Sequence, residues 1–284
     1  MGHPYEHERV GLATIHGKEL AIAPPFRRLL GAEIVVAPDL DTDTLGTFSG
    51  EVARPGPIVE TCMIKAELAF RTLDVDCAIA SEGSYGPIDR VPLKPAGVEV
   101  MAFIDRRRGI KIIETLATHR TNWRLLRFKG GDPEAAAAVT ALGFPGSGVF
   151  VIASSDASRP VKGLTRLDEV VSAIDQEANR SDDGLAIVIA DMRAHRNPTR
   201  MKVLRALSWK LARRLHCLCP ACGAPGFGHI DSRRGLPCED CSEPTHWIDF
   251  EIDGCAACGH AVARSRKDGR RTASKLSCVT CRGA

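Results

Sequence analysis

Cys219-Pro220-Ala221-Cys222 is the first of four Cys-x-x-Cys pairs, and the others are Cys238-Glu239-Asp240-Cys241, Cys255-Ala256-Ala257-Cys258 and Cys278-Val279-Thr280-Cys281. Between the first and second pairs lie 15 residues, and between the third and fourth lie 19, which is the spacing of two four-cysteine zinc sites. A tight turn that carries two thiolates can bind one tetrahedral ion. The four pairs therefore predict two structural zinc ions, because four cysteine ligands leave no open coordination position for catalysis.

The placement of the cysteines supports metal binding over disulfide formation. Nine of the 11 cysteines lie within residues 217–281, and the other two, Cys62 and Cys77, are interpreted as small core residues. The start of the chain is polar and lacks the apolar core of a signal peptide, so we expect a cytoplasmic protein whose thiols stay reduced. The tail has few large apolar side chains, so metal binding must supply its folding free energy.

The sequence leaves the pairing of the four motifs open. Sequential ribbons, which join the first pair to the second and the third to the fourth, are the favoured interpretation. A cross-brace that joins the first pair to the third is the alternative. The spare side chains that could replace one ligand are Cys217, His216, His229, His246 and His260.

The composition changes near residue 215, and this change predicts two domains. Residues 1–215 form an α/β domain that ends in a basic connecting helix, residues 199–215, and residues 216–284 form a tandem zinc-ribbon module. Within the net charge of +3, residues 192–284 sum to +9 and residues 1–191 to −6. The basic C-terminal part could bind nucleic acid. No apolar run is long enough to cross a bilayer, so no membrane partner is expected.

Apolar, β-prone runs alternate with amphipathic stretches through the first 195 residues. The expected strands are 10–15, 32–37, 75–80, 149–153 and 185–190, of which 32–37, 149–153 and 185–190 are expected to be buried. Residues 98–104 and 110–116 are expected to form a β-hairpin. The expected helices include one that begins near Pro57, one at 132–142 and one at 164–179. The pattern predicts an α/β fold with a layered mixed sheet, followed by the small tandem zinc-ribbon domain.

Three polar segments carry the candidate ligand site of the α/β domain. The first is residues 14–19, at a turn between a strand and a helix; the second is residues 46–51 with Arg54; the third is residues 81–87, interpreted as a glycine turn after a strand. Ligands of open α/β sheets lie outside the carboxyl ends of the strands, so the first and third segments should face one crevice. Lysines there suit phosphate, and carboxylates could hold a divalent ion. The candidate ligand-binding residues are Thr14, His16, Arg54, Glu60, Ser81, Gly83 and Ser84.

A fourth polar segment, residues 191–200, follows the last expected strand and caps the basic helix. Its arginines could clamp an anion. The candidate ligand-binding residues are Asp191, Arg193, Asn197 and Arg200.

Three short motifs resemble those of the inosine triphosphatase-like nucleoside triphosphate pyrophosphatases. They are Thr14 to Lys18, the ETCMIKA segment at 60–66, and a strand that ends in Ser81-Glu82-Gly83, within residues 10–125. The resemblance implies that Lys18 and Lys65 bind phosphates and that Glu82 helps to hold Mg²⁺. A second resemblance covers nearly the whole chain. GTFSGE at 46–51, SEGSYGP at 81–87 and DMRAHRNPTR at 191–200 are similar to segments of an uncharacterised bacterial family that joins an α/β domain to zinc ribbons.

These patterns lead to two functional hypotheses. The first is a metal-dependent hydrolase of a nucleotide or another phosphate-containing small molecule, which uses Mg²⁺ and carries two structural zinc ions. Its candidate catalytic residues are Glu82, Lys18, Lys65 and Glu51. The alternative is a non-enzymatic zinc-ribbon module that binds nucleic acid or protein.

Overall fold

The computed structural model describes residues 2–37, 40, 42–46, 52–88 and 91–283. It is a mixed α/β fold, as the alternating pattern predicts, and its strands form three sheets. The chain forms two compact units. The larger unit comprises Tyr5–Arg107 and Lys111–Ala212, and the smaller comprises Met1–Pro4, Arg108–Ile110 and Arg213–Ala284. Within the described ranges, no helix has the length and apolarity that a membrane span requires.

The first sheet of the larger unit has the strand order β2-β1-β3-β4-β5. Its strands are β1 (Arg9–Leu12), β2 (Glu33–Val36), β3 (Cys77–Ile88), β4 (Val91–Asp105) and β5 (Ile110–Thr118). Strand β1 is parallel to both of its neighbours, whereas β3 and β4 are antiparallel. The short β1 pairs only with residues 77–79 of β3. Beyond Ile79, the edge of β3 that faces β1 therefore forms no further pairs with β1.

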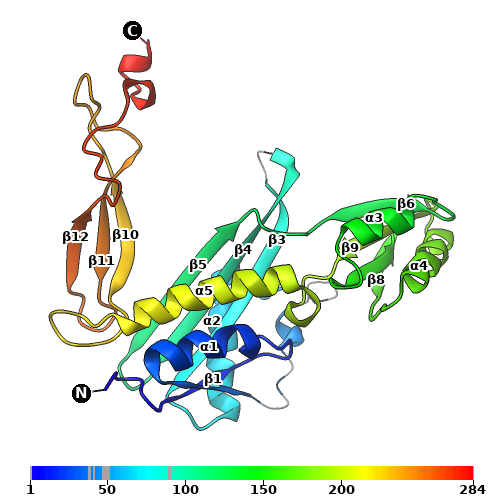
Figure 1. Cartoon of the computed structure of the whole chain (residues 1–284), viewed down its shortest axis with the longest axis horizontal. Coiled ribbons are helices and arrows are strands. Elements are labelled where there is room, and N and C mark those ends of the chain that lie inside the picture. Colours follow the sequence, from blue (N-terminus) through cyan, green and yellow to red (C-terminus); the bar gives the residue numbers. More distant parts are fainter. Residues whose placement is uncertain (1, 38–39, 41, 47–51, 89–90, 284) are drawn as a thin grey trace. The chain divides into compact units, whose positions relative to one another are not determined.

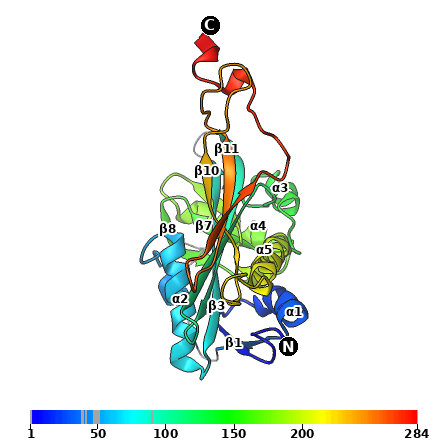
Figure 2. The same ribbon diagram turned by 90° about the vertical axis from the view of Figure 1, so that its left-hand side faces the viewer.

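Helices cover both faces of this sheet. They are α1 (Glu19–Leu30), α2 (Ile58–Thr72) and α5 (Pro198–His216). Figure 2 shows α2 on one side of the sheet, and α1 and α5 on the other. Ala80 and Val100 pack with Cys62 on the α2 side, and Phe103 contacts Phe26 of α1 on the opposite side. Because side chains alternate along a strand, neighbouring residues of β3 and β4 contribute to sites on opposite faces.

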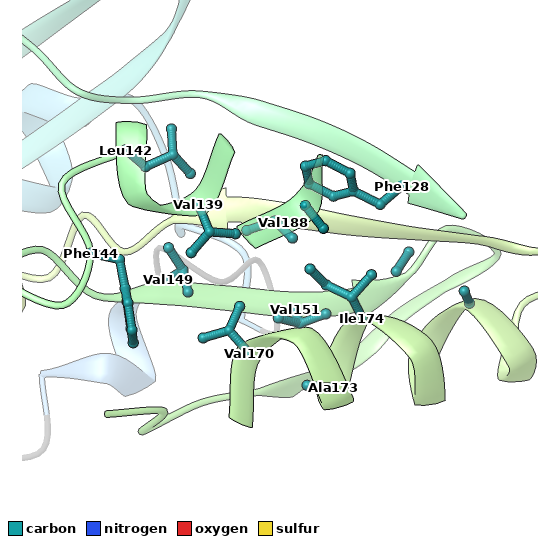
Figure 3. Close-up of a cluster of buried hydrophobic side chains, with 13 residues drawn as sticks. Phe128, Val139, Leu142, Phe144, Val149, Val151, Val170, Ala173, Ile174 and Val188 are labelled. Carbon is teal, nitrogen blue, oxygen red and sulfur yellow. The ribbon is translucent and has the colours of Figure 1, made fainter. Parts of the chain in front are cut away.

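The second sheet of the larger unit is wholly antiparallel, with the order β6-β9-β7-β8. Its elements are β6 (Leu125–Lys129), α3 (Ala135–Ala141), β7 (Val149–Ala153), β8 (Asp156–Val161), α4 (Leu167–Arg180) and β9 (Leu185–Ala190). Phe128, Val139, Val151 and Ile174 belong to one buried cluster that α3 and α4 close over the sheet (Figure 3). This sheet has its own hydrophobic core. The candidate ligand residues of β3 belong to the first sheet.

The smaller unit contains one antiparallel sheet of β10 (Gly228–Arg234), β11 (Ile248–Gly254) and β12 (Ala261–Ser265), with β11 in the centre (Figure 1). Four short 3-10 helices complete the described elements, at Asp43–Leu45, Ala194–Arg196, Lys275–Ser277 and Cys281–Gly283.

Two expectations about local structure are wrong. Residues 81–87 are part of β3, not a turn, because each of them pairs with a residue of β4 between Pro95 and Met101. The run at 32–37 gives β2, which lies at the edge of the sheet and is only partly buried. In both cases composition was a poor guide because strand pairing depends on a distant partner strand.

Candidate functional site

Each of the first three Cys-x-x-Cys pairs adopts the same type of backbone turn. In the first, the Cys219 N–H donates to the carbonyl of Ala224, and the Cys219 carbonyl accepts from the Gly223 N–H, both at 2.8 Å. The same two bonds form at the second and third pairs. The residue after each second cysteine has a positive φ: 73° at Gly223, 62° at Ser242 and 73° at Gly259. Glycine adopts this conformation freely, so only Ser242 meets a steric cost here.

The eight cysteines gather into two groups, each of which could hold a metal ion. They are Cys219, Cys222, Cys255 and Cys258 in one group, and Cys238, Cys241, Cys278 and Cys281 in the other. The Sγ atoms of Cys219 and Cys258 are 3.8 Å apart, and those of Cys241 and Cys278 are 3.6 Å apart. A tetrahedral zinc ion with bonds of about 2.3 Å requires sulfur pairs roughly 3.8 Å apart. The donor set and its spacing therefore fit two structural zinc ions.

The favoured sequential pairing is wrong, and the alternative, which joins the first pair to the third, is the one the structure shows. The sheet explains why. The first pair precedes β10 and the third follows β11, and the antiparallel register places Gly228 opposite Gly254, at the same end. The second pair lies in the connection between Arg234 and Ile248, which are paired at the other end. Because the strands are antiparallel, successive Cys-x-x-Cys turns lie at alternate ends of the sheet.

The spare ligands and the basic loop have other partners. None of the spare histidines belongs to either sulfur group in the described residues, and neither does Cys217. Arg264 pairs with Glu251 at 2.7 Å and Asp253 at 3.0 Å, and Arg266 pairs with Asp268 at 2.5 Å. Four thiolates around one Zn²⁺ carry a formal charge of −2, so two loaded sites lower the formal +9 of residues 192–284 to +5. The basic surplus of the tail is therefore smaller than its sequence indicates.

Lys18 is the centre of a second candidate site, in the α/β unit. It lies in the turn between β1 and α1, its side chain is buried, and its Nζ donates to the Ser81 carbonyl at 2.7 Å. This carbonyl belongs to the part of β3 that extends beyond β1. Burial and the nearby Arg200 lower the pKa of Lys18 to about 8. Among the described residues, no carboxylate forms an ion pair with this ammonium group.

Glu82 forms ion pairs with two basic side chains on the α2 face of the sheet. Lys65 of α2 donates to it at 2.6 Å and Arg54 at 3.1 Å, and Arg54 also donates to the carbonyl of Gly83. Burial alone would raise the pKa of Glu82, but Lys18 and Lys65 hold that pKa below its ordinary value. Glu82 is therefore an ionised carboxylate whose oxygens are both engaged.

Glu99 and Arg200 form a fully buried ion pair on the α5 face. The Arg200 Nε donates to Glu99 at 2.5 Å, Tyr85 donates to the same carboxylate at 2.7 Å, and Arg200 also donates to the Met192 carbonyl. Gly83 is opposite Glu99 in the sheet, and a Cβ at this position would lie 2.5 Å from the Glu99 carboxylate. Glycine is needed there because the ion pair lies directly over the strand.

These residues define the Lys18 cluster: Lys18, Arg54, Lys65, Ser81, Glu82, Tyr85, Glu99 and Arg200. Its four cations face two carboxylates, so its formal charge is +2 when all of them are ionised. The Ser81 hydroxyl is buried and has no hydrogen-bond partner in the described part of the chain. The cluster thus has a surplus of positive charge beside a hydroxyl with free hydrogen-bonding capacity.

The other predicted ligand residues of the first three segments lie around or outside this cluster. Thr14 is buried in the same turn and accepts a hydrogen bond from the His16 N–H. Ser84 and Glu60 are exposed. Glu51 lies outside the described residues, so its predicted catalytic role stays a prediction.

The fourth segment has a structural explanation. The Asn197 side chain accepts from the Arg200 N–H at 2.9 Å, which caps α5, and Pro198 occupies its first turn. Arg193 pairs with Asp191 at 2.8 Å rather than with Glu99 or Glu82. The two arginines of this segment are therefore engaged by different carboxylates, and their role in binding an anion stays a prediction.

Sequence reasoning missed Glu99. The signal was present, because Glu99 has the same strand parity as Met101 and Phe103, which are buried on the α1 and α5 side. A charged residue in register with two core residues needs a buried partner. Arg200, 101 residues later, could not be identified as that partner from local sequence.

Comparison with known protein families identifies the family to which this chain is similar. The profile of a family described as "Domain of unknown function (DUF6671)" matches residues 65–283, more than half of the chain. A search of curated proteins finds no match. The family match supports the resemblance to an uncharacterised family and adds no support for the one to inosine triphosphatase-like enzymes.

Proposed function

The chain belongs to this family of unknown function, and we propose that its α/β unit binds the phosphate group of a small molecule at the Lys18 cluster. The observation that carries the proposal is the buried Lys18 ammonium, which lacks a carboxylate partner among the described residues. A buried charge is costly unless it is paired. A bound anion would supply that missing charge.

Phosphate suits this position better than a carboxylate ligand does. Lys18 and Ser81 both have hydrogen-bonding capacity to spare, and Arg54 lies at the partly exposed margin of the cluster. A phosphate group has several strong acceptor oxygens and a larger negative charge, so it can accept from the Lys18 ammonium and the Ser81 hydroxyl together. The net formal charge of +2 matches that requirement.

A more specific version of this proposal is that the α/β unit hydrolyses a bound nucleotide. The lysines and Arg54 would stabilise the negative charge that develops on a transferring phosphoryl group. A bound Mg²⁺ would activate the attacking water, but both oxygens of Glu82 already accept from cations, and Glu99 is bound by Arg200. The described carboxylates therefore favour phosphate binding over Mg²⁺ binding.

Calorimetric titration of the full-length, zinc-loaded protein with pyrophosphate and with nucleoside triphosphates tests binding. We expect Lys18→Gln to weaken the affinity about tenfold or more, because it removes a charge-assisted hydrogen bond. Lys111→Gln is the matched control, since Lys111 is an exposed lysine of β5. Equal affinity in wild type and Lys18→Gln would overturn the proposal.

The pH dependence of the wild-type protein gives an independent test. The pKa of Lys18 is about 8, so its ammonium loses a proton as the pH rises through this value. Affinity for pyrophosphate should fall roughly tenfold between about pH 8 and pH 9.5. Phosphate release, measured with and without Mg²⁺, then separates a binding protein from a hydrolase.

The smaller unit supports a second candidate function, binding of single-stranded nucleic acid. A groove of about 400 Å³ is lined by Arg266, Arg270 and Arg271 together with Phe250, whose side chain is 39% exposed. Arginine and an exposed aromatic ring are the groups that hold a backbone phosphate and stack on a base. Asp249 also lines the groove and lowers its positive charge.

Fluorescence anisotropy with a labelled single-stranded oligonucleotide tests this second candidate. The double variant Arg270→Gln/Arg271→Gln should weaken binding about tenfold or more and reduce its salt dependence. Arg205→Gln, at an exposed arginine of α5 outside the groove, is the control. Unchanged affinity of the double variant would remove the groove from consideration.

A further inference from the structure

A groove of about 470 Å³ lies between β5 and the first half of α5, apart from the Lys18 cluster. Its apolar lining comes from Leu116 of β5 and from Val203 and Ala206 of α5. Its polar lining comes from Thr118, Thr199, Arg120 and Lys202. This volume is within the range of small-molecule sites, which are mostly apolar with a few placed polar groups.

The two cations of the groove have no ion pair with any described residue. Lys210 provides the contrast on the same helix. It pairs with Glu114 at 2.8 Å and donates to the Thr115 carbonyl, so its charge is balanced. Lys202 lies eight residues earlier, about 12 Å along the helix axis, where β5 offers Leu116 and Thr118 in place of a carboxylate. The charge of Lys202 is therefore available to a ligand.

We infer that this groove binds an amphipathic carboxylate, with its head group on Lys202 and Arg120 and its apolar body against Leu116, Val203 and Ala206. The charge of the groove selects an anion, and the apolar side of its lining selects a ligand with a hydrocarbon or aromatic body. The two threonine hydroxyls can donate hydrogen bonds to the same carboxylate.

The site is independent of the phosphate proposal. Lys202 follows Arg200 by two residues, which turns it by about 200° around the helix axis. Arg200 contacts Glu99 in the buried layer, whereas Lys202 is exposed. A ligand in the groove can therefore bind without displacing the buried ion pair, and each site can be tested with the other intact.

Titration of the full-length, zinc-loaded protein with octanoate, followed by ligand-observed NMR and calorimetry, tests the inference. We expect saturable binding of octanoate and about tenfold or more weaker binding of acetate and of octanol, because each lacks one half of the recognition. Lys202→Gln and Arg120→Gln should each weaken octanoate binding about fivefold. Ala206→Phe, at an exposed position, should fill the groove and abolish binding.

Lys210→Gln is the matched control, a lysine on the same helix that lies outside the groove, and it should bind octanoate as the wild type does. Circular dichroism checks that every variant is folded. Octanoate binding that is absent, that is no tighter than octanol binding, or that survives both Lys202→Gln and Ala206→Phe would overturn the inference.

Discussion

The two units of this chain represent two ways in which a sequence can specify a site. In the smaller unit, one turn recurs at three cysteine pairs with the same backbone bonds, and the sulfur ligands are evident from spacing alone. In the larger unit, the Lys18 cluster assembles from a turn, a helix, two strands and a residue of α5. A metal site is encoded by local motifs, whereas a buried charge cluster depends on packing between distant segments. The following experiments test that difference.

Metal removal should have the largest effect, and it should be confined to the smaller unit. Structural zinc contributes about 10–16 kcal/mol to small zinc-dependent folds, and the sheet of the smaller unit has little buried apolar surface of its own. Chelation should therefore unfold residues 213–283 while the cores around Phe103 and Val151 persist. Limited proteolysis with mass spectrometry measures this, and a tail that stays resistant without metal would refute it.

Double cysteine substitutions should distinguish the observed grouping of the Cys-x-x-Cys pairs from the sequential one. Cys222→Ser/Cys258→Ser removes two ligands of one group, so the variant should retain about one equivalent of zinc. Cys222→Ser/Cys241→Ser damages both groups and should lose most of the metal. Elemental analysis of the purified variants gives the answer. Sequential pairing predicts the opposite outcome for these two variants.

Breaking the buried ion pair should destabilise the larger unit. Glu99→Gln leaves the Arg200 guanidinium buried without its carboxylate, which costs roughly 3–5 kcal/mol. Glu67→Gln is the control, because its partner Arg106 is half exposed and such pairs contribute about 1 kcal/mol or less. Urea denaturation followed by circular dichroism measures both. Similar losses in the two variants would contradict the role assigned to burial.

Ser242→Gly should give the smallest effect and should be stabilising. Ser242 has a φ of 62° at the position where the equivalent turns have Gly223 and Gly259. Relief of that conformation should be worth about 1 kcal/mol, partly offset by the greater freedom of glycine in the unfolded chain. Competition with a zinc chelator should show tighter retention of the second metal ion. Weaker retention would mean that the serine side chain itself supports the turn.

Prediction from sequence succeeded where the pattern is local. The mixed α/β fold follows from alternating apolar runs, and the two sulfur groups follow from four Cys-x-x-Cys motifs. It failed at residues 81–87, where glycines and hydroxyls indicate a turn although pairing with β4 makes a strand. The division of these strands between two sheets of the larger unit was not predicted, because no local signal indicates which strands share a core.

The sequence alone determined that eight thiolates would form two ion-binding groups and that lysines and a glutamate would concentrate in the first part of the chain, because these facts depend on residue type and spacing. Tertiary structure decided which cysteines share a group, since an antiparallel sheet places alternate turns at opposite ends. It also decided that Glu99 meets Arg200 and that Lys18 meets Ser81. Such contacts arise only when helices and strands pack, and no motif in the chain encodes them.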